Sequence, residues 1–74
     1  MQTPPPYQQQ MEIIARNIRK LRLQRKFTVQ ELAYRCDMER SNLSRIEAGH
    51  SNPTLRTLCA ISRALEVPLV ELFR

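Results

Sequence analysis

The side chains best able to do chemistry in this chain are basic, and they are concentrated in one stretch. Residues 16–45 hold nine basic and three acidic residues, a local charge of +6. From Ile46 onward, three arginines balance three glutamates. A cationic half joined to a neutral half predicts that one side of the molecule binds a polyanion, above all nucleic acid. A solvated charged surface without a partner is the alternative.

Groups suited to covalent or metal chemistry are few. The chain has two cysteines, Cys36 and Cys59, and one histidine, His50, with no second ligand at metal-binding spacing. There is no pairing of a nucleophile with a base and no glycine-rich phosphate loop. The sequence therefore predicts no enzyme, no metal and no cofactor. Both cysteines are expected to be small core residues of a protein from a reducing compartment.

The polar start of the chain and its hydropathy predict the cellular compartment of the protein. No apolar run approaches the ~18 residues of a membrane span, and the polar start has no signal-peptide character. A cytoplasmic protein without a membrane partner is expected. Residues 1–10, rich in proline and glutamine, predict a flexible tail, and an arm that touches a DNA groove is the alternative. Residues 11–74 are long enough for one small domain.

Helical periodicity divides residues 11–74 into five short helices, which predicts an all-α fold. The first helix begins at Met11 and the second covers about residues 29–35, after a capping box made by Thr28 and Glu31. The third covers about residues 40–48 and ends before Gly49, a residue suited to a left-handed helix end. The fourth follows Thr54, with an inward stripe that starts at Leu55 and includes Leu58, Ile61 or Ser62, and Leu65. The fifth covers Leu69 to Phe73.

The connection between the second and third helices carries the functional prediction. Only about four residues join them, which is too few for antiparallel packing and fits the crossed arrangement of a helix-turn-helix. The stretch TVQELAYRCDMERSNLSRIEAG, from Thr28 to Gly49, resembles the helix-turn-helix of the Cro/repressor-type (Xre) family of bacterial and phage DNA-binding proteins. The segments NPTLRTL, ALEV and PLVEL resemble the fourth and fifth helices of that family.

This resemblance implies a five-helix, lambda-repressor-like domain that regulates transcription, as a repressor, by binding double-stranded DNA. Its third helix would be the recognition helix, with Arg40, Ser41, Ser44 and Arg45 facing base edges. Arginine can donate two hydrogen bonds to guanine, whereas serine reads bases with little selectivity. Arg40 can alternatively pair with Glu39, Asp37 or a phosphate, and Arg45 can bind phosphate alone. The two serines can also be ordinary helix-surface residues.

Further positions of the resemblance are suited to the DNA backbone. The start of the second helix offers free backbone N–H groups and the positive end of a helix dipole. The turn after the third helix is polar. The expected phosphate contacts are Thr28, Gln30, Asn42, His50, Ser51, Asn52 and Thr54. Each of them can alternatively be simple turn or cap chemistry.

The resemblance also assigns a structural role to two charged residues and marks three departures. Arg22 and Glu47 occupy the positions of an ion pair that locks the recognition helix against the first helix. Lys26 and Asp37 stand where the family often has glycine, and a left-handed lysine costs roughly 1 kcal/mol. Glu39 replaces the usual serine or threonine cap of the recognition helix.

Apolar residues near the C-terminal end predict a partner chain. The last helix carries more apolar surface than so small a core can bury, with Leu69, Val70 and Phe73 expected at the interface of a symmetric homodimer. Such a dimer would read a near-palindromic operator. A different class of function is a protein-interaction or antitoxin-type module that keeps the fold, with a toxin or another regulator as its partner.

Overall fold

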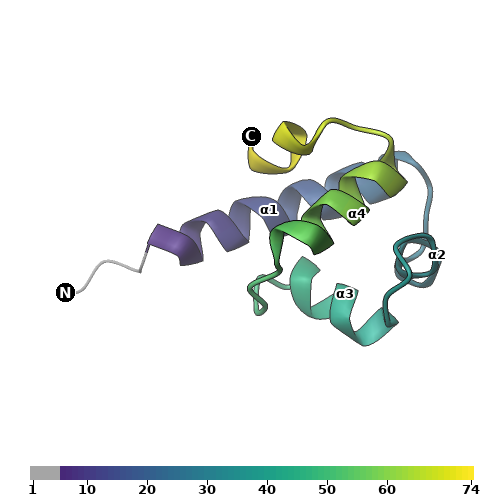
Figure 1. Ribbon diagram of the computed structural model, residues 1–74, viewed down its shortest axis with the longest axis horizontal. Coiled ribbons are helices and arrows are strands. Elements are labelled where there is room, and N and C mark those ends of the chain that lie inside the picture. Colours follow the sequence, from purple (N-terminus) through teal and green to yellow (C-terminus); the bar gives the residue numbers. More distant parts are fainter. Residues whose placement is uncertain (1–5) are drawn as a thin grey trace.

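The computed structural model describes residues 6–74, which form four α-helices and a short 3-10 helix (Figure 1). The elements are α1 (Pro6–Gln24), α2 (Val29–Arg35), α3 (Arg40–Glu47), α4 (Leu55–Leu65) and η1 (Leu69–Phe73). No strand occurs in these residues, so the all-α prediction is confirmed.

The prediction of five α-helices is wrong by one, because the last segment, η1, is a 3-10 helix. Its Glu71 N–H donates to the Pro68 carbonyl oxygen at 3.0 Å, an i to i+3 bond. A segment of five residues gains too few i to i−4 bonds to offset the cost of starting an α-helix, so the tighter 3-10 form is typical at this length.

The first helix begins earlier than its apolar spacing predicts. The sequence places residues 6–10 in a tail, whereas the structure places them in α1; the rest of that tail lies outside the described residues. Pro6 is well suited to a first helical position because its fixed φ matches the helix and its missing N–H would be unpaired there. Residues 6–10 are exposed, so they extend α1 beyond the core without packing against it (Figure 1).

All five elements contribute to one core. Its fully buried large side chains are Ile18, Leu32, Leu43, Ile61, Leu65 and Leu72. Two predictions about the core are wrong: Leu55 is 64% exposed and Cys59 is also exposed. Cys59 follows the buried Leu58 by one residue, which rotates its side chain about 100° around α4 and away from the core. Cys36 is half-buried, as expected of a small residue packed against the core.

All four α-helices end in the same way. After each, one residue has a positive φ: Lys26 (60°), Asp37 (55°), Gly49 (75°) and Glu66 (58°). The residue that follows donates its N–H to a carbonyl five residues back, as Phe27 does to Arg22 and His50 does to Arg45. This is the Schellman motif, which satisfies carbonyls at a helix end and turns the chain sharply. It lets short helices cross one another within a small core.

Candidate nucleic-acid interface

The outer face of α3 holds the four residues expected to meet DNA bases. Arg40, Ser41, Ser44 and Arg45 are all exposed. On the opposite side of α3, Leu43 is fully buried and Ile46 is 5% exposed. The helix therefore rests on α1 and α2 through its apolar side and presents its polar side to solvent. Arg40 forms no ion pair within residues 6–74, so neither Glu39 nor Asp37 neutralises it.

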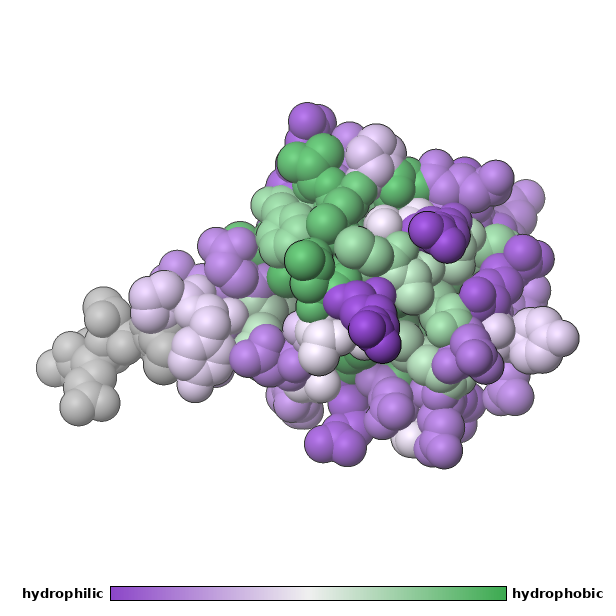
Figure 2. All heavy atoms as spheres, in the orientation of Figure 1, coloured by the Kyte–Doolittle hydropathy of each residue, from purple (hydrophilic) through white to green (hydrophobic). Residues whose placement is uncertain are grey.

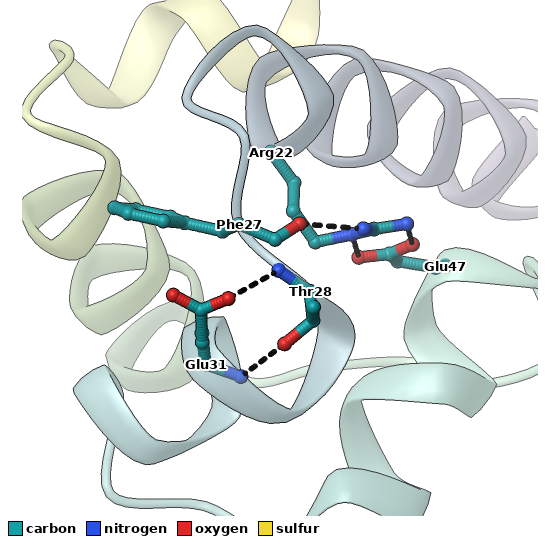
Figure 3. A network of polar contacts seen from close by, with 5 residues as sticks. All are labelled: Arg22, Phe27, Thr28, Glu31 and Glu47. Carbon is teal, nitrogen blue, oxygen red and sulfur yellow. Dashed lines mark hydrogen bonds and ion pairs between the residues drawn. The ribbon is translucent and has the colours of Figure 1, made fainter.

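A buried ion pair fixes α3 against α1. Arg22 is only 8% exposed, and its Nε and Nη2 donate to the two carboxylate oxygens of Glu47 at 2.8 and 3.0 Å (Figure 3). The remaining nitrogen, Nη1, donates to the Phe27 carbonyl oxygen at 2.9 Å. Paired, parallel bonds of this kind are strong and directional. One guanidinium thus joins α1, the end of α3 and the residue just before the cap of α2.

The start of α2 carries the predicted capping box. The Glu31 N–H donates to Thr28 Oγ1 at 3.0 Å, and the Thr28 N–H donates to Glu31 Oε1 at 3.1 Å (Figure 3). The Thr28 N–H is therefore occupied, and the expectation that it is free for a phosphate is wrong. Val29 and Gln30, the next two residues, belong to the first turn of α2, where N–H groups lack intrahelical partners.

A hollow beside α3 gathers most of the other expected phosphate contacts. Asn42, Arg45, Ser51, Asn52 and Thr54 all line it, so the turn after α3 and the start of α4 stand next to the recognition surface. Thr54 also caps α4, because its Oγ1 accepts the Thr57 N–H at 3.2 Å.

Three expected contacts do not line this hollow. Thr28 and Gln30 belong to the beginning of α2, and His50 is exposed just after the end of α3. The polar groups therefore fall into two regions, one at the start of α2 and one along the turn between α3 and α4.

The potential metal ligands of the described part of the chain are not gathered in one place. No group of three or more His, Cys, Asp or Glu residues within residues 6–74 could hold a metal ion. Burial raises the pKa of the Cys36 thiol to about 11, so this group is a neutral thiol at physiological pH. Its Sγ faces the Ala60 carbonyl oxygen at 3.8 Å. None of the helices described is long and apolar enough to cross a membrane.

Several contacts escape prediction from the sequence. Asn17 Nδ2 donates to the carbonyl oxygens of Leu72 and Arg74, at 3.0 and 2.6 Å, and so fastens η1 to α1. Arg25 pairs with Glu66 at 2.7 Å, and the Arg35 guanidinium lies 4.4 Å from the centre of the Phe27 ring. The one available signal was Asn17, a polar residue between apolar positions of the first helix. Arg25 and Arg35, two of the basic residues between positions 16 and 45, therefore make contacts within the fold.

A short α2, a tight turn and an exposed, firmly held α3 define a helix-turn-helix protein. The family model described as "Helix-turn-helix" matches residues 18–72, and the chain belongs to this family. Among curated proteins it is similar to the HTH-type transcriptional regulator SlrR of Bacillus subtilis (strain 168), with 40% identity over 62 residues. The match covers 82% of this chain, and the chain spans only 41% of the length of that relative.

Solved structures show the same fold. The chain is similar to the hypothetical transcription factor NHTF from Neisseria, with a TM-score of 0.87 and 26% identity over 100% of this chain and 85% of that one. It is also similar to the restriction-modification controller protein C.Esp1396I, solved as a tetramer in complex with its natural operator. That match has a TM-score of 0.78 and 33% identity, and it covers 85% of this chain and 83% of the controller.

Proposed function

We propose that the protein is a sequence-specific regulator of transcription that binds double-stranded DNA and reads bases with α3. The observation that carries this proposal is the polar face of α3, with Arg40, Ser41, Ser44 and Arg45 exposed on a helix whose other side is buried. A helix presented in this way fits the major groove, where each base pair shows a distinct pattern of donors and acceptors.

The residues around α3 suit the DNA backbone, which sets the register of a protein without carrying sequence information. On one side, Asn42, Ser51, Asn52 and Thr54 offer neutral donors next to Arg45. On the other side, Thr28 offers its hydroxyl and Gln30 its amide, at the positive end of α2. His50 adds a further donor after α3. We propose these seven residues as phosphate contacts.

A second copy of the chain would complete the molecule. Val70 and Phe73 are 50% and 40% exposed, and Leu55 adds a third exposed apolar side chain. Figure 2 shows apolar surface gathered over η1 and the first part of α4. Leu69, the residue before Val70, packs partly against the core. A symmetric dimer through this face would place two α3 helices about 34 Å apart, which suits a near-palindromic operator.

The effect on transcription that we propose requires only that the protein bind DNA. A dimer seated on an operator excludes other proteins from the same DNA, so we propose repression as its effect and the cytoplasm of a bacterial cell as its place. Binding to an operator needs no cofactor and no catalytic group. The operator-bound tetramer of the similar controller C.Esp1396I supports a mode of action in which several copies share one site.

Selection from a random pool of duplexes tests the proposal. We expect enrichment of a site with two related halves, and binding to it that weakens steeply as salt rises. Each half is expected to contain at least one guanine, because arginine is the selective side chain on α3. If no sequence is enriched over the starting pool, the protein is an interaction module that keeps the fold, and a protein partner becomes the object of the search.

A further inference from the structure

The first helix runs beside the end of the recognition helix. A Cβ added to Gly49, just after α3, would lie 3.8 Å from Glu12 Cγ and 4.0 Å from Ala15 Cβ, both on α1. Between the two helices runs an open groove. Its α1 wall includes Ala15, Arg16, Arg19, Lys20 and Leu23, and its other wall is formed by Glu47, the last residue of α3, and by Ala48 and Gly49, which follow it. This groove lies outside the set of residues assigned above to bases or phosphates.

Three cations line the α1 side of this groove. Arg16, Arg19 and Lys20, called the α1 strip below, are exposed and form no ion pair within residues 6–74. Of the two carboxylates in the lining, Glu47 is already neutralised by Arg22, which leaves Glu12 alone against three positive charges. Leu23 is the one large apolar side chain in the lining. An apolar helix laid in this groove would leave the three cations without partners, whereas a polyanion would pair with them.

The position of the groove indicates which polyanion would bind there. Arg22, on the same helix, bonds both to Glu47 at the end of α3 and to the Phe27 carbonyl just before α2. The groove therefore adjoins the recognition helix and lies near the start of α2, where the proposed function already places a phosphate. A DNA strand that passes the start of α2 is within reach of the α1 strip.

We infer that the α1 strip binds phosphates of the DNA that flanks the bases read by α3. The inference rests on the proposed function and extends it, since it assigns contacts to a helix that lies outside the helix-turn-helix itself. Arg16 stands before residue 18, where the family match begins. These contacts would raise affinity for every sequence and lengthen the DNA that the protein needs.

Salt dependence of binding to the selected operator tests the strip. The single variants Arg16→Gln, Arg19→Gln and Lys20→Gln each remove one charge from an exposed position, so the fold should be kept. Each lost phosphate contact is expected to reduce the slope of log affinity against log salt by about 0.9. Arg63→Gln, an exposed position on α4, is the matched control for net charge and is expected to leave the slope unchanged.

Two further measurements sharpen the test. Ethylation of single phosphates is expected to interfere with wild-type binding outside the half-site, and this interference should disappear for the Arg19→Gln variant. Trimming the flanks of the duplex should weaken the wild type most and each strip variant less, because each variant has already lost one of the three flanking contacts. If the wild type binds its selected operator but the strip variants behave like Arg63→Gln, this inference is overturned and the proposed function stands. An acidic peptide would then be the ligand to test in the groove. Failure of the wild type to prefer any duplex would overturn the proposed function instead.

Discussion

Two arginines and two serines on the outer face of α3 cannot contribute equally to recognition. The guanidinium carries a fixed fork of donors that matches guanine O6 and N7, whereas a serine hydroxyl can both donate and accept and so distinguishes bases poorly. Arg40 stands in the first turn of α3 without a carboxylate partner in the described residues, so its donors are available. Selectivity should therefore depend mainly on Arg40, with Arg45 second.

Replacing Arg40 by Ala tests this division. The change should cost about 1 to 3 kcal/mol of binding to the selected site and relax the preference at one base position. Titration against the site and against single-base variants of it provides the measurement, with Arg63→Ala as the control. Equal weakening on all sequences would mean that Arg40 contacts phosphate only.

Removing Glu47 tests the ion pair under α3. The variant Glu47→Ala leaves the Arg22 charge buried with only one carbonyl partner, and breaking such a pair costs about 3 to 5 kcal/mol. Urea unfolding followed by circular dichroism measures the loss. The control is Glu66→Ala, which breaks the exposed pair with Arg25 and should cost at most about 1 kcal/mol. Unchanged stability of Glu47→Ala would show that the pair does not hold α3 in place.

The two cysteines should differ sharply in reactivity. The thiolate is the reactive form, and the pKa of Cys36, raised to about 11 by burial, keeps that thiol protonated at pH 8. Cys59 is exposed on α4. Iodoacetamide at pH 8 should therefore modify Cys59 first, as read from peptide masses, and a Cys59→Ser variant should react slowly. Rapid modification of Cys36 in the folded protein would contradict this burial.

At the scale of the elements, the same Schellman motif ends all four α-helices of residues 6–74 and sets the direction in which the chain leaves each one. Each α-helix stops at a residue with positive φ, yet only one of the four is glycine. Lys26, Asp37 and Glu66 adopt this conformation against the steric preference of a residue with a Cβ. The hydrogen bonds of the motif and the packing of the next helix offset that cost.

Substitution of Lys26 by Gly should relieve the cost at one helix end. Because φ is 60° there, the variant is expected to be more stable by about 1 kcal/mol. Chemical unfolding measures the gain. Lys20→Gly is the matched control, since Lys20 lies inside α1, where glycine should reduce stability by about 1 kcal/mol. Loss of stability in Lys26→Gly would show that the lysine side chain contributes more than its backbone strain costs.

At the scale of the whole molecule, the proposed DNA surface and the centre of the proposed dimer surface lie on different elements. The cations that we propose for DNA lie on α1 and α3, whereas the exposed apolar residues that we propose for the dimer, Val70 and Phe73, lie on η1. A protein built in this way can bind DNA with one surface and a second copy with the other. Pairing of two copies doubles the number of base contacts without enlarging the domain.

Assembly can be tested by changing the apolar face alone. Val70→Asp and Phe73→Asp should each shift the protein from dimer to monomer in sedimentation velocity and weaken binding to a two-part operator. The folded domain should persist, because both side chains are substantially exposed. Tyr34→Asp changes an 86% exposed aromatic residue on α2 and should leave the dimer intact. A wild type that remains monomeric at high micromolar concentration would contradict the proposal.

Many features of this protein could be predicted from its sequence because they depend on interactions between residues close together in the chain. The capping box of Thr28 and Glu31, the left-handed Gly49 and the apolar spacing of Leu43 and Ile46 depend on residues within one or two turns of each other. Such contacts form in any helix with that pattern, so the helix-turn-helix and its exposed face could be predicted.

Only the tertiary structure decided the features that depend on residues far apart in the chain. Periodicity alone did not reveal that Cys59 and Leu55 lie outside the core, because burial at the edge of a helix depends on which neighbour covers it. The partners of Arg25 and Asn17 lie 41 and 55 or more residues away, and packing alone brings them together. For the same reason, the tertiary structure separated arginines that hold the fold, such as Arg22 and Arg25, from the exposed arginines of α1 and α3 that we propose for DNA.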